Sequence, residues 1–377
     1  MGAFEKCSGK TDTMNLSQTA INCSIIRGGT SRGYFFREVD LPQEPQARER
    51  VLLSVIGGPD ALQVDGVGGG HPLTNKIAIV RPSTRQDADV DYLFLQVAAD
   101  SQTISAAQNC GNILSGVGAF AIDEEMVVAT DGTTRIRVHM ENSGNSCELL
   151  VPTPGGVVEY AGETKIDGVP GSAAAITCNF LDVAGSATGA LLPTGSQQDE
   201  VDGVVVTCID NGMPVVLLKA SDFGVTGQES PDELDTNTEL KNRLENVRGL
   251  IGSKMNLGNV TDKTVPKMCL ISEPKLGGVV ATRTFIPYNC HKSIGVLGAV
   301  SVATACLLPG SIASDLASVP DGAEKTMDVE HPSGSLRVRL VVDAEAPPEQ
   351  MIKSAGVVRT ARILMRGVVF VPSEYGV

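Results

Sequence analysis

Tryptophan is absent from this chain of 377 residues, and the aromatic share is only 4%. Proteins that bind single-stranded nucleic acid stack its bases on aromatic side chains, so this scarcity argues against that class of partner. Positive charge is also in short supply, because 44 acidic residues outnumber 30 basic ones and leave a net charge of −14. Nucleic acids and anionic membranes repel such a chain. We therefore expect neither as a partner, whereas a small anionic substrate remains compatible with a local cluster of positive groups.

Metal-binding and disulfide patterns are missing as well. The chain has only four histidines and no CxxC pair, so we predict no metal site. Its nine cysteines are scattered and odd in number, which is typical of a reduced, cytoplasmic chain. Residues 1–19 have no apolar run of the kind found in secretory signals, and they are predicted to form a disordered or ragged extension.

The longest apolar run, Ile294–Leu308, has fifteen residues. About 20 are needed to cross a bilayer, so this run predicts a buried helix.

Short runs rich in valine, isoleucine and threonine, bounded by glycine, proline and aspartate, predict many strands. The clearest are Asp91–Val97, Gly203–Ile209 and Leu336–Val342. Arg48–Ile56 is predicted to be a helix because two glycines follow it. Glu239–Ile251 places its apolar residues on one face, as a surface helix does.

Two further segments, Gly111–Ile122 and Ser293–Leu308, are apolar almost all round, which is typical of helices enclosed by protein. Each follows an Asn-Cys pair and contains Gly-Ala at the same spacing, with an offset of 180 residues. Shorter matches flank them in the same order. The sequence thus predicts a duplicated α/β (α+β) fold, with halves at 20–195 and 196–357 and a ligand cleft between them.

The start of the first buried helix carries informative chemistry. Backbone N–H groups in a first helical turn lack helical partners and carry partial positive charge, so small residues there leave them open to a carboxylate. Asn109, Cys110, Gly111 and Asn112 form such a start. The same field favours the thiolate of Cys110, whose alternative role is that of a buried packing residue.

The second buried helix is predicted to begin in the same way. Its start offers similar amides and a cationic side chain, from Asn289, Cys290, His291, Lys292 and Ser293. Two such starts facing each other would bind a di- or tricarboxylate.

Lys76 follows the glycine-rich run 66–70, which lacks the Gly-Lys-Ser/Thr ending of a phosphate-binding loop. The run is predicted to be a tight turn that delivers Lys76 to a strand at 77–80. Most lysines are solvated surface charges, but one in this position is expected to be partly withdrawn from water, which would suit it to general-base work.

Arg27, Gly28, Gly29, Thr30 and Ser31 offer a guanidinium group, backbone amides and two hydroxyls, although an ordinary turn has the same composition. His71, His139 and His331 are expected to be structural or exposed. No GxSxG motif is present, so a serine hydrolase is not supported.

Several of these motifs, taken together and in order, resemble those of the PrpF family, within the diaminopimelate-epimerase-like superfamily. The resemblance covers about residues 20–372 and is strongest to the group that acts on 4-oxalomesaconate. In the first half it rests on 27–31, 65–69, 73–76, 89–94 and 108–112. In the second it rests on 208–214, 255–258, 265–267, 290–295, 330–334 and 358–362.

The resemblance implies two similar halves, each a curled sheet or barrel around a central helix, with residues from about 358–377 completing the first half. It also implies a cofactor-free isomerase that moves a proton between allylic positions of an unsaturated di- or tricarboxylate. The family's lysine and cysteine fall on Lys76 and Cys110 of this sequence. A homodimer is compatible with this reading.

Our hypothesis from the sequence is that Lys76 or Cys110 removes the proton and that helix-end amides stabilise the resulting enolate. The predicted substrate-binding residues are Arg27, Gly28, Gly29, Thr30, Ser31, Asn109, Gly111, Asn112, Lys267, His291, Lys292, Ser293 and Ile294. One carboxylate is expected on Gly111 and Asn112, and another on Ser293 and Ile294.

Several alternatives stay open at this stage. The substrate could be methylaconitate, methylitaconate or aconitate. An amino-acid epimerase would use Cys290 opposite Cys110, and a non-catalytic protein would only bind polycarboxylates. Positions 71, 75, 288, 289 and 292 depart from the residues common in the resembling family and bear on the choice of substrate.

Overall fold

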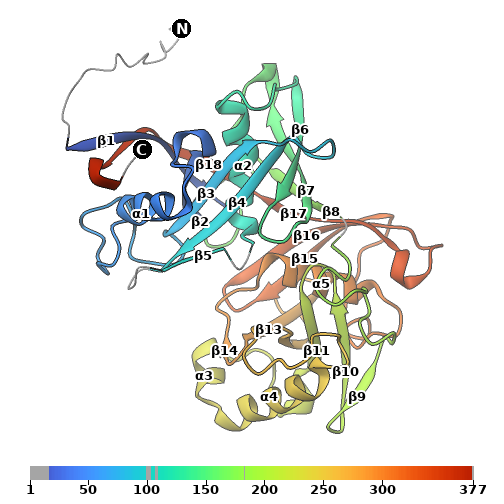
Figure 1. Cartoon of the computed structure of the whole chain (residues 1–377). Coiled ribbons are helices and arrows are strands. Elements are labelled where there is room, and N and C mark those ends of the chain that lie inside the picture. Colours follow the sequence, from blue (N-terminus) through green and yellow to red (C-terminus); the bar gives the residue numbers. More distant parts are fainter. Residues whose placement is uncertain (1–16, 99–102, 107–108, 182, 376–377) are drawn as a thin grey trace.

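The computed structural model describes residues 17–98, 103–106, 109–181 and 183–375. The expected extension at 1–19 therefore lies almost entirely outside the described residues, as do Cys7 and Gln108. All eighteen strands of the described chain belong to one continuous sheet that curls around two buried helices (Figure 1). The eight described cysteines are free.

The strands fall into two sets with the same order of pairing. The first set is β1 (Gln18–Gly28), β2 (Ser31–Arg37), β3 (Lys76–Pro82), β4 (Val90–Val97), β5 (Ile104–Ser105), β6 (Gly132–Met140), β7 (Ser146–Thr153) and β8 (Ile176–Leu181). The second is β9 (Asp199–Val201), β10 (Val204–Asp210), β11 (Pro214–Lys219), β12 (Lys267–Ser272), β13 (Val280–Ile286), β14 (Asn289–Cys290), β15 (Glu324–His331), β16 (Gly334–Val342) and β17 (Ile352–Arg359). The last strand is β18 (Ala361–Pro372).

In the first set, β2–β3 and β4–β6 are parallel pairs, and β3–β4 and β6–β7 are antiparallel. The second set repeats this with parallel β11–β12 and β13–β15 and antiparallel β12–β13 and β15–β16. The predicted duplication of the fold is confirmed by this topology. The residue limits given to the two halves remain a prediction.

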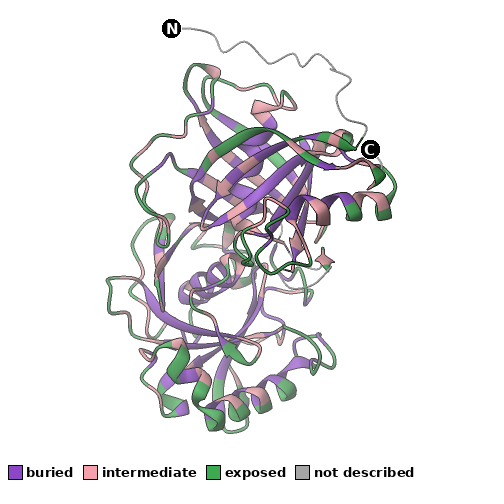
Figure 2. Cartoon of the chain, turned by 90° about the vertical axis from the view of Figure 1, so that its left-hand side faces the viewer, coloured by how far each residue is buried: buried purple, intermediate pink, exposed green. Residues whose placement is uncertain are grey.

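The helices are α1 (Pro45–Ile56), α2 (Gly111–Asp123), α3 (Pro231–Thr236), α4 (Thr238–Gly252) and α5 (Val296–Leu307). Single 3-10 turns occur at Glu38–Asp40, Pro154–Gly156, Ala220–Phe223, Pro348–Gln350 and Ser373–Tyr375. Figure 2 shows buried residues along the central helix and the sheet around it, and exposed residues on the outer helices and loops.

The two central helices are enclosed because their small residues let strands approach. A Cβ added at Gly116 would lie 2.9 Å from the ring of Phe35, and one at Gly118 would lie 2.7 Å from Val151. All residues from Ile113 to Ala121 are buried. The segments predicted to be buried helices are therefore confirmed as α2 and α5, although α5 begins three residues later than expected.

The outer helices follow local signals. Four apolar residues of α4 are buried on one face, as predicted, and Asn237 caps its start by accepting from the amide of Leu240 at 3.0 Å. α1 begins three residues before its predicted start because Glu44 accepts from the amides of Gln46 and Ala47 and Pro45 occupies the first position.

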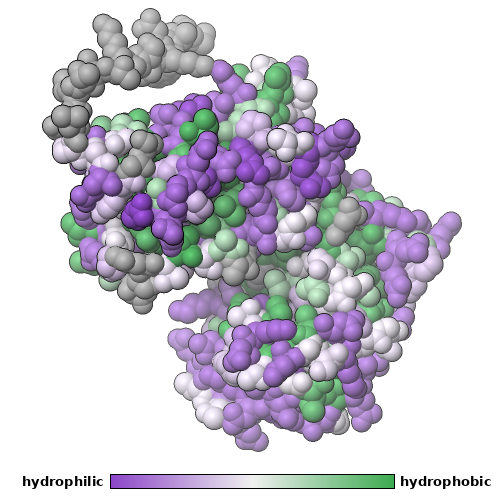
Figure 3. Space-filling view, viewed as in Figure 1, coloured by the Kyte–Doolittle hydropathy of each residue, from purple (hydrophilic) through white to green (hydrophobic). Residues whose placement is uncertain are grey.

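Two strand pairs connect the ends and the halves of the chain. β17 of the second half pairs with β8 of the first, and β18 pairs along β1 from Gln18–Pro372 to Gly28–Ala361. The N-terminal and C-terminal strands thus lie side by side in the upper half of Figure 1. The surface is indented on the left-hand side of Figure 3, where the two halves meet.

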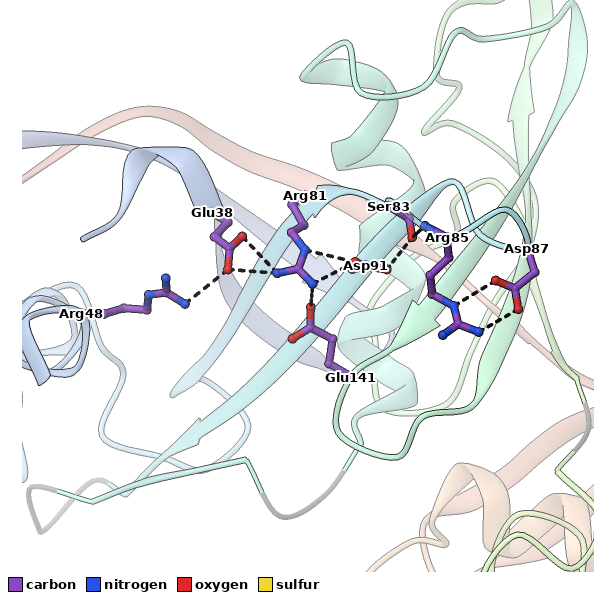
Figure 4. A network of polar contacts seen from close by, with 8 residues as sticks. All are labelled: Glu38, Arg48, Arg81, Ser83, Arg85, Asp87, Asp91 and Glu141. Carbon is purple, nitrogen blue, oxygen red and sulfur yellow. Dashed lines mark hydrogen bonds and ion pairs between the residues drawn. The ribbon is translucent and has the colours of Figure 1, made fainter. Parts of the chain in front are cut away.

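An ion-pair network stabilises one end of the β3–β4 hairpin (Figure 4). Arg81 lies 2.9 Å from Asp91, 3.1 Å from Glu38 and 2.7 Å from Glu141. Arg81 lies near the end of β3, whereas Lys76 is the first residue of that strand. Within the described residues, no helix is both long and apolar enough to cross a membrane.

Candidate active site

The starts of α2 and α5 face each other across the boundary between the halves. Cys110 precedes α2 and Gly295 precedes α5, and their carbonyl groups accept the first helical hydrogen bonds, from Leu114 at 2.9 Å and Ala299 at 2.8 Å. A Cβ added at Gly111 would lie 3.1 Å from Val296, so the first residues of the two helices are in contact. The amides at 111–113 and 296–298 therefore have no hydrogen-bond acceptor within their helices, and the two sets lie beside each other.

The second helix start differs from the sequence-based expectation. The amide of Ser293 donates to Nδ1 of His291 at 2.8 Å, and Ile294 is buried in the apolar interior. Because Gly295 is the residue that precedes the helix, Ser293 and Ile294 lie before its first turn, and the docking of a carboxylate on their amides stays a prediction. The corresponding amides belong to residues 296–298.

Cys290 does not occupy the position opposite Cys110. It lies in β14, where it pairs with Phe285, and the residue is 5% exposed. Burial raises the pKa of Cys290 to about 12, with a further increase from Asp235. The residue that corresponds to Cys110 is Gly295, so the arrangement needed by a two-cysteine epimerase is absent from this site.

Lys76 is buried at the start of β3, with 7% of its surface exposed. Its ammonium donates to Oε1 of Gln96, its cross-strand partner, at 2.7 Å and lies 5.1 Å from the centre of the Phe94 ring. Gln96 in turn donates to the backbone oxygen of Asn75 at 2.9 Å. No ion pair in the described chain includes Lys76, so its charge is held by neutral groups only. Sequence patterns gave no signal for Gln96.

Cys110 and Lys76 lie on the same side of β4. The Tyr92 hydroxyl is 3.5 Å from the carbonyl oxygen of Cys110, and Phe94 lies under Lys76. Because residues two apart in a strand point to the same face, both contacts are made inside the curled sheet. The thiol-bearing residue and the amine therefore flank one pair of aromatic rings.

The glycine-rich run before Lys76 is a packed turn, as predicted. A Cβ at Gly69 would contact Thr74 and Arg32, and the amide of Gly69 donates to Oδ1 of the fully buried Asn75 at 3.1 Å. The amide of Gly70 donates to Gln63 at 2.7 Å. These amides are occupied by the turn itself.

The turn between β1 and β2 packs against the start of α2. Thr30 accepts a hydrogen bond from Nδ2 of Asn112 at 3.0 Å, and added Cβ atoms at Gly28 and Gly29 would overlap Asn112. Ser31 is 2% exposed and its hydroxyl has no partner in the described residues. The structure thus brings Gly28, Gly29, Thr30 and Ser31 together with Asn112.

Arg27 has a different position from these neighbours. One of its terminal nitrogens donates to the carbonyl oxygens of Gly29 and Thr360 at 2.9 and 3.0 Å, so part of the guanidinium holds the turn. Burial lowers the pKa of Arg27, and so does Arg362. Ile26 packs on α2, so Arg27 points to the outer face of β1. There it lines a cavity of about 340 Å³ with Thr30 and Gly168.

Asn109 lies at the mouth of the first helix start. Its Nδ2 donates to the hydroxyl of Ser143 at 2.7 Å, while its Oδ1 and that of Asn112 are buried without a partner in the described residues. Lys292, predicted to bind substrate, is exposed.

In the second half, the predicted residues Lys267, His291 and Ser293 form a cluster. Lys267 begins β12 as Lys76 begins β3, and burial, followed by Arg248, lowers its pKa to about 8. Burial also lowers the pKa of His291, and Lys267 lowers it further. The Ser293 hydroxyl is 3.2 Å from Nε2 of His331.

His331 was expected to be structural or exposed, and it is 6% exposed within this cluster. Burial lowers its pKa to about 4. No sequence pattern could place it beside Ser293, because 38 residues separate the two. In the described residues no group of three histidine, cysteine or carboxylate side chains could hold a metal ion.

The loop that contains Asp167 and Gly168 links the group around Asn112 to the cluster of Lys267, His291 and Ser293. Thr30 lies 3.2 Å from the position of an added Cβ at Gly168, and the carboxylate of Asp167 accepts from the amide of Ser335 at 2.6 Å. The loop therefore contacts the β1–β2 turn on one side and the β15–β16 turn on the other.

The chain is similar to known proteins over most of its length. The model of the family described as PrpF protein matches residues 18–372. A 4-oxalomesaconate tautomerase from Pseudomonas putida is 55% identical over 354 residues, which cover 94% of this chain and 97% of the relative.

Solved structures show the same architecture. A methylitaconate Δ-isomerase matches with a TM-score of 0.87 and 33% identity, covering 95% of this chain and 97% of its own. A hydroxyproline epimerase from Agrobacterium vitis matches with a TM-score of 0.53 and 11% identity over 94% of this chain and 92% of its own, which shows a shared fold. The predicted fold class is confirmed by these matches.

Proposed function

The chain belongs to the PrpF family and is an isomerase, and from this premise we propose that it shifts a proton between allylic positions of an unsaturated tricarboxylate, 4-oxalomesaconate. The relative at 55% identity is named for that substrate. The reaction requires a base, an acid and a site that stabilises the negative charge of an enolate.

One observation carries this proposal: a buried lysine without a carboxylate partner and a cysteine at a helix start lie on the same side of β4. The ammonium of Lys76 needs a counter-charge, which a carboxylate of the substrate would supply. The amides of Gly111 and Asn112 would bind a carboxylate or the developing enolate. Either the Cys110 thiolate or Lys76 as its neutral amine removes the proton, and the thiol or ammonium so formed, or the protonated form of the other group, returns one to the new position.

The second half contributes charge and hydrogen bonds in this proposal. A pKa of about 8 keeps most of Lys267 protonated at neutral pH. Its ammonium and the Ser293 hydroxyl would face a second carboxylate across the boundary from Gly111. The reaction moves only a proton, so the proposal includes no cofactor.

The test is deuterium incorporation at the allylic carbon during turnover in D₂O, followed by proton NMR. We expect Lys76→Met and Cys110→Ser to lower the rate by about 10²- to 10⁴-fold, the usual contribution of a general acid or base. Lys353→Met, at an exposed lysine paired with Asp343, is the matched control and should match the wild type. Full activity in both site variants would contradict the mechanism.

The similarity to a methylitaconate isomerase favours a second candidate substrate. Assaying 4-oxalomesaconate beside 3-methylitaconate separates the two, since the natural substrate should have the higher kcat/KM. Binding of tricarboxylates without any deuterium exchange would instead show a non-catalytic binding protein.

A further inference from the structure

Arg359, the last residue of β17, is a buried charge without a counter-charge. It is 7% exposed, and among the described residues its Nε has no hydrogen-bond partner and its one hydrogen bond is a 3.4 Å contact to the neighbouring Val358 carbonyl. No ion pair among the described residues includes it. Burial lowers the pKa of Arg359, and the opposing influence comes from the Cys178 thiol. A guanidinium stays protonated in proteins, so this charge is costly while it remains unpaired.

The two other buried arginines of the described chain have better hydrogen-bond partners. Arg283, also 7% exposed, donates to the carbonyl oxygens of Glu229 and Thr282 at 2.6 and 2.9 Å. Arg248 is fully buried and makes two 2.6 Å hydrogen bonds to the carboxylate of Glu245. It also donates to the carbonyl oxygens of Val260 and Lys263 at 2.8 and 3.1 Å. Arg248 and Arg283 thus both donate hydrogen bonds shorter than 3 Å to acceptors of the fold, whereas Arg359 has only its 3.4 Å contact among the described residues.

The position of Arg359 is at the junction of the halves. β17 is the strand of the second half that pairs with β8 of the first, and Arg359 is opposite Ile176 there. Ala355 and Val357 belong to the apolar interior around the central helices, so alternation along the strand places Arg359 on that same inner face.

The same guanidinium lies near the start of α5. β16 pairs with β17 on one side and with β15 on the other, and β15 ends at His331. Burial lowers the pKa of His331, and His291 and then Arg359 lower it further, while Asp167 raises it. His331 contacts Ser293, two residues before Gly295. Arg359 therefore lies beside the second-half cluster of Lys267, His291 and Ser293, on the side of that cluster that faces the first half.

We propose that Arg359 binds one carboxylate of the substrate and so forms a carboxylate subsite with Ser293 between the two halves. An arginine offers a planar pair of N–H groups that matches a carboxylate, and the bond is strong where water is excluded. This inference rests on the proposed function, because it takes the substrate to be a polycarboxylate. The subsite would select anions long enough to reach from the start of α2 to Arg359.

Arg359→Met, which preserves length and removes the charge, provides the first test. The unliganded variant should be at least as resistant to urea as the wild type, because it loses an unpaired buried charge. Citrate, a tricarboxylate without an allylic double bond, should raise the melting temperature of the wild type and leave that of the variant unchanged. KM should increase by roughly 30-fold or more, as for a buried charge pair that loses one partner.

Two further variants complete the test. Arg359→Lys keeps the charge but not the paired N–H groups, so it should fold normally and bind citrate more weakly than the wild type. Arg337→Met, at an exposed arginine of the adjacent strand paired with Asp328, should behave as the wild type. Unchanged citrate binding in either Arg359 variant would overturn the proposal, as would loss of stability in Arg359→Met with citrate binding retained. If the wild type isomerises neither substrate, the proposed function fails, while citrate binding still decides the role of Arg359.

Discussion

His331 illustrates how burial determines the charge of a single side chain. Its pKa is lowered from 6.5 to about 4, chiefly by burial. The unfolded chain binds this proton near pH 6.5 and the folded chain only near pH 4. The unfolded state therefore binds more protons within that window, and stability falls as the pH decreases from 6.5 toward 4.

We expect His331 alone to reduce the free energy of unfolding by about 2 kcal/mol between pH 7 and pH 5. Urea denaturation at the two pH values measures this loss. His331→Gln should lose less stability over the interval than the wild type, whereas His71→Gln, at an exposed histidine, should lose as much. An equal loss in the wild type and His331→Gln would contradict the assignment.

Among single residues, those that stand beside a clear local pattern could be placed from the sequence. Lys76 stands next to a glycine-rich turn and Cys110 next to small residues before an apolar run, and both lie where these patterns placed them. Gln96 and His331 are joined to the candidate site by contacts between residues distant in the sequence, and no spacing predicts such contacts. Cys290 was misplaced because a matching offset in sequence does not determine which residue precedes a helix.

Close approach of backbone segments positions α2. An alanine at Gly28 would overlap the backbone oxygen of Asn112, in the first turn of the helix, and would lie 3.2 Å from the Cα of Ile113. Neither neighbour is a flexible side-chain end, so the helix start must shift.

We expect Gly28→Ala to destabilise the protein by about 1–3 kcal/mol, the usual cost of overpacking, and to reduce kcat because the amides of α2 move. Thermal denaturation and the exchange assay measure the two effects. Gly367→Ala, in the exposed part of β18 with no atoms near the added Cβ, should change neither. Wild-type stability and rate in Gly28→Ala would show that this contact is unimportant.

Among whole elements, those with a strong local signal were predictable. The amphipathic pattern gave α4 to within one residue at each end, and the all-apolar pattern gave the start of α2 correctly and its end to within one residue. The start of α5 was missed because Gly295 and the Ser293–His291 hydrogen bond interrupt a continuous apolar run. Strand positions followed from alternation, but the parallel pairs within each repeat and the antiparallel β8–β17 pair that joins the repeats depend on the fold as a whole.

Across the whole molecule, the two halves are coupled through the β8–β17 pair and the contact between α2 and α5. Gly356 lies opposite Asn179 in that pair, where an added Cβ would lie 2.5 Å from the Asn179 side chain and 2.9 Å from the Cys178 carbonyl oxygen. A larger residue at this position should push the two strands apart.

We expect wild-type protein to unfold in one calorimetric transition and Gly356→Val to unfold in two, because each half keeps its own central helix. Differential scanning calorimetry distinguishes the outcomes, and Gly367→Val serves as the control. A single transition at the wild-type temperature in Gly356→Val would mean that the halves are held together elsewhere.

The pairing of β18 with β1 has a consequence for synthesis on the ribosome. β1 must wait for β18 before this edge of it is covered, whereas the strands around α5 have all been made by then. Domains generally fold as they are synthesised. Here the order is reversed, because the half made first gains its last strand only after the other half has been synthesised.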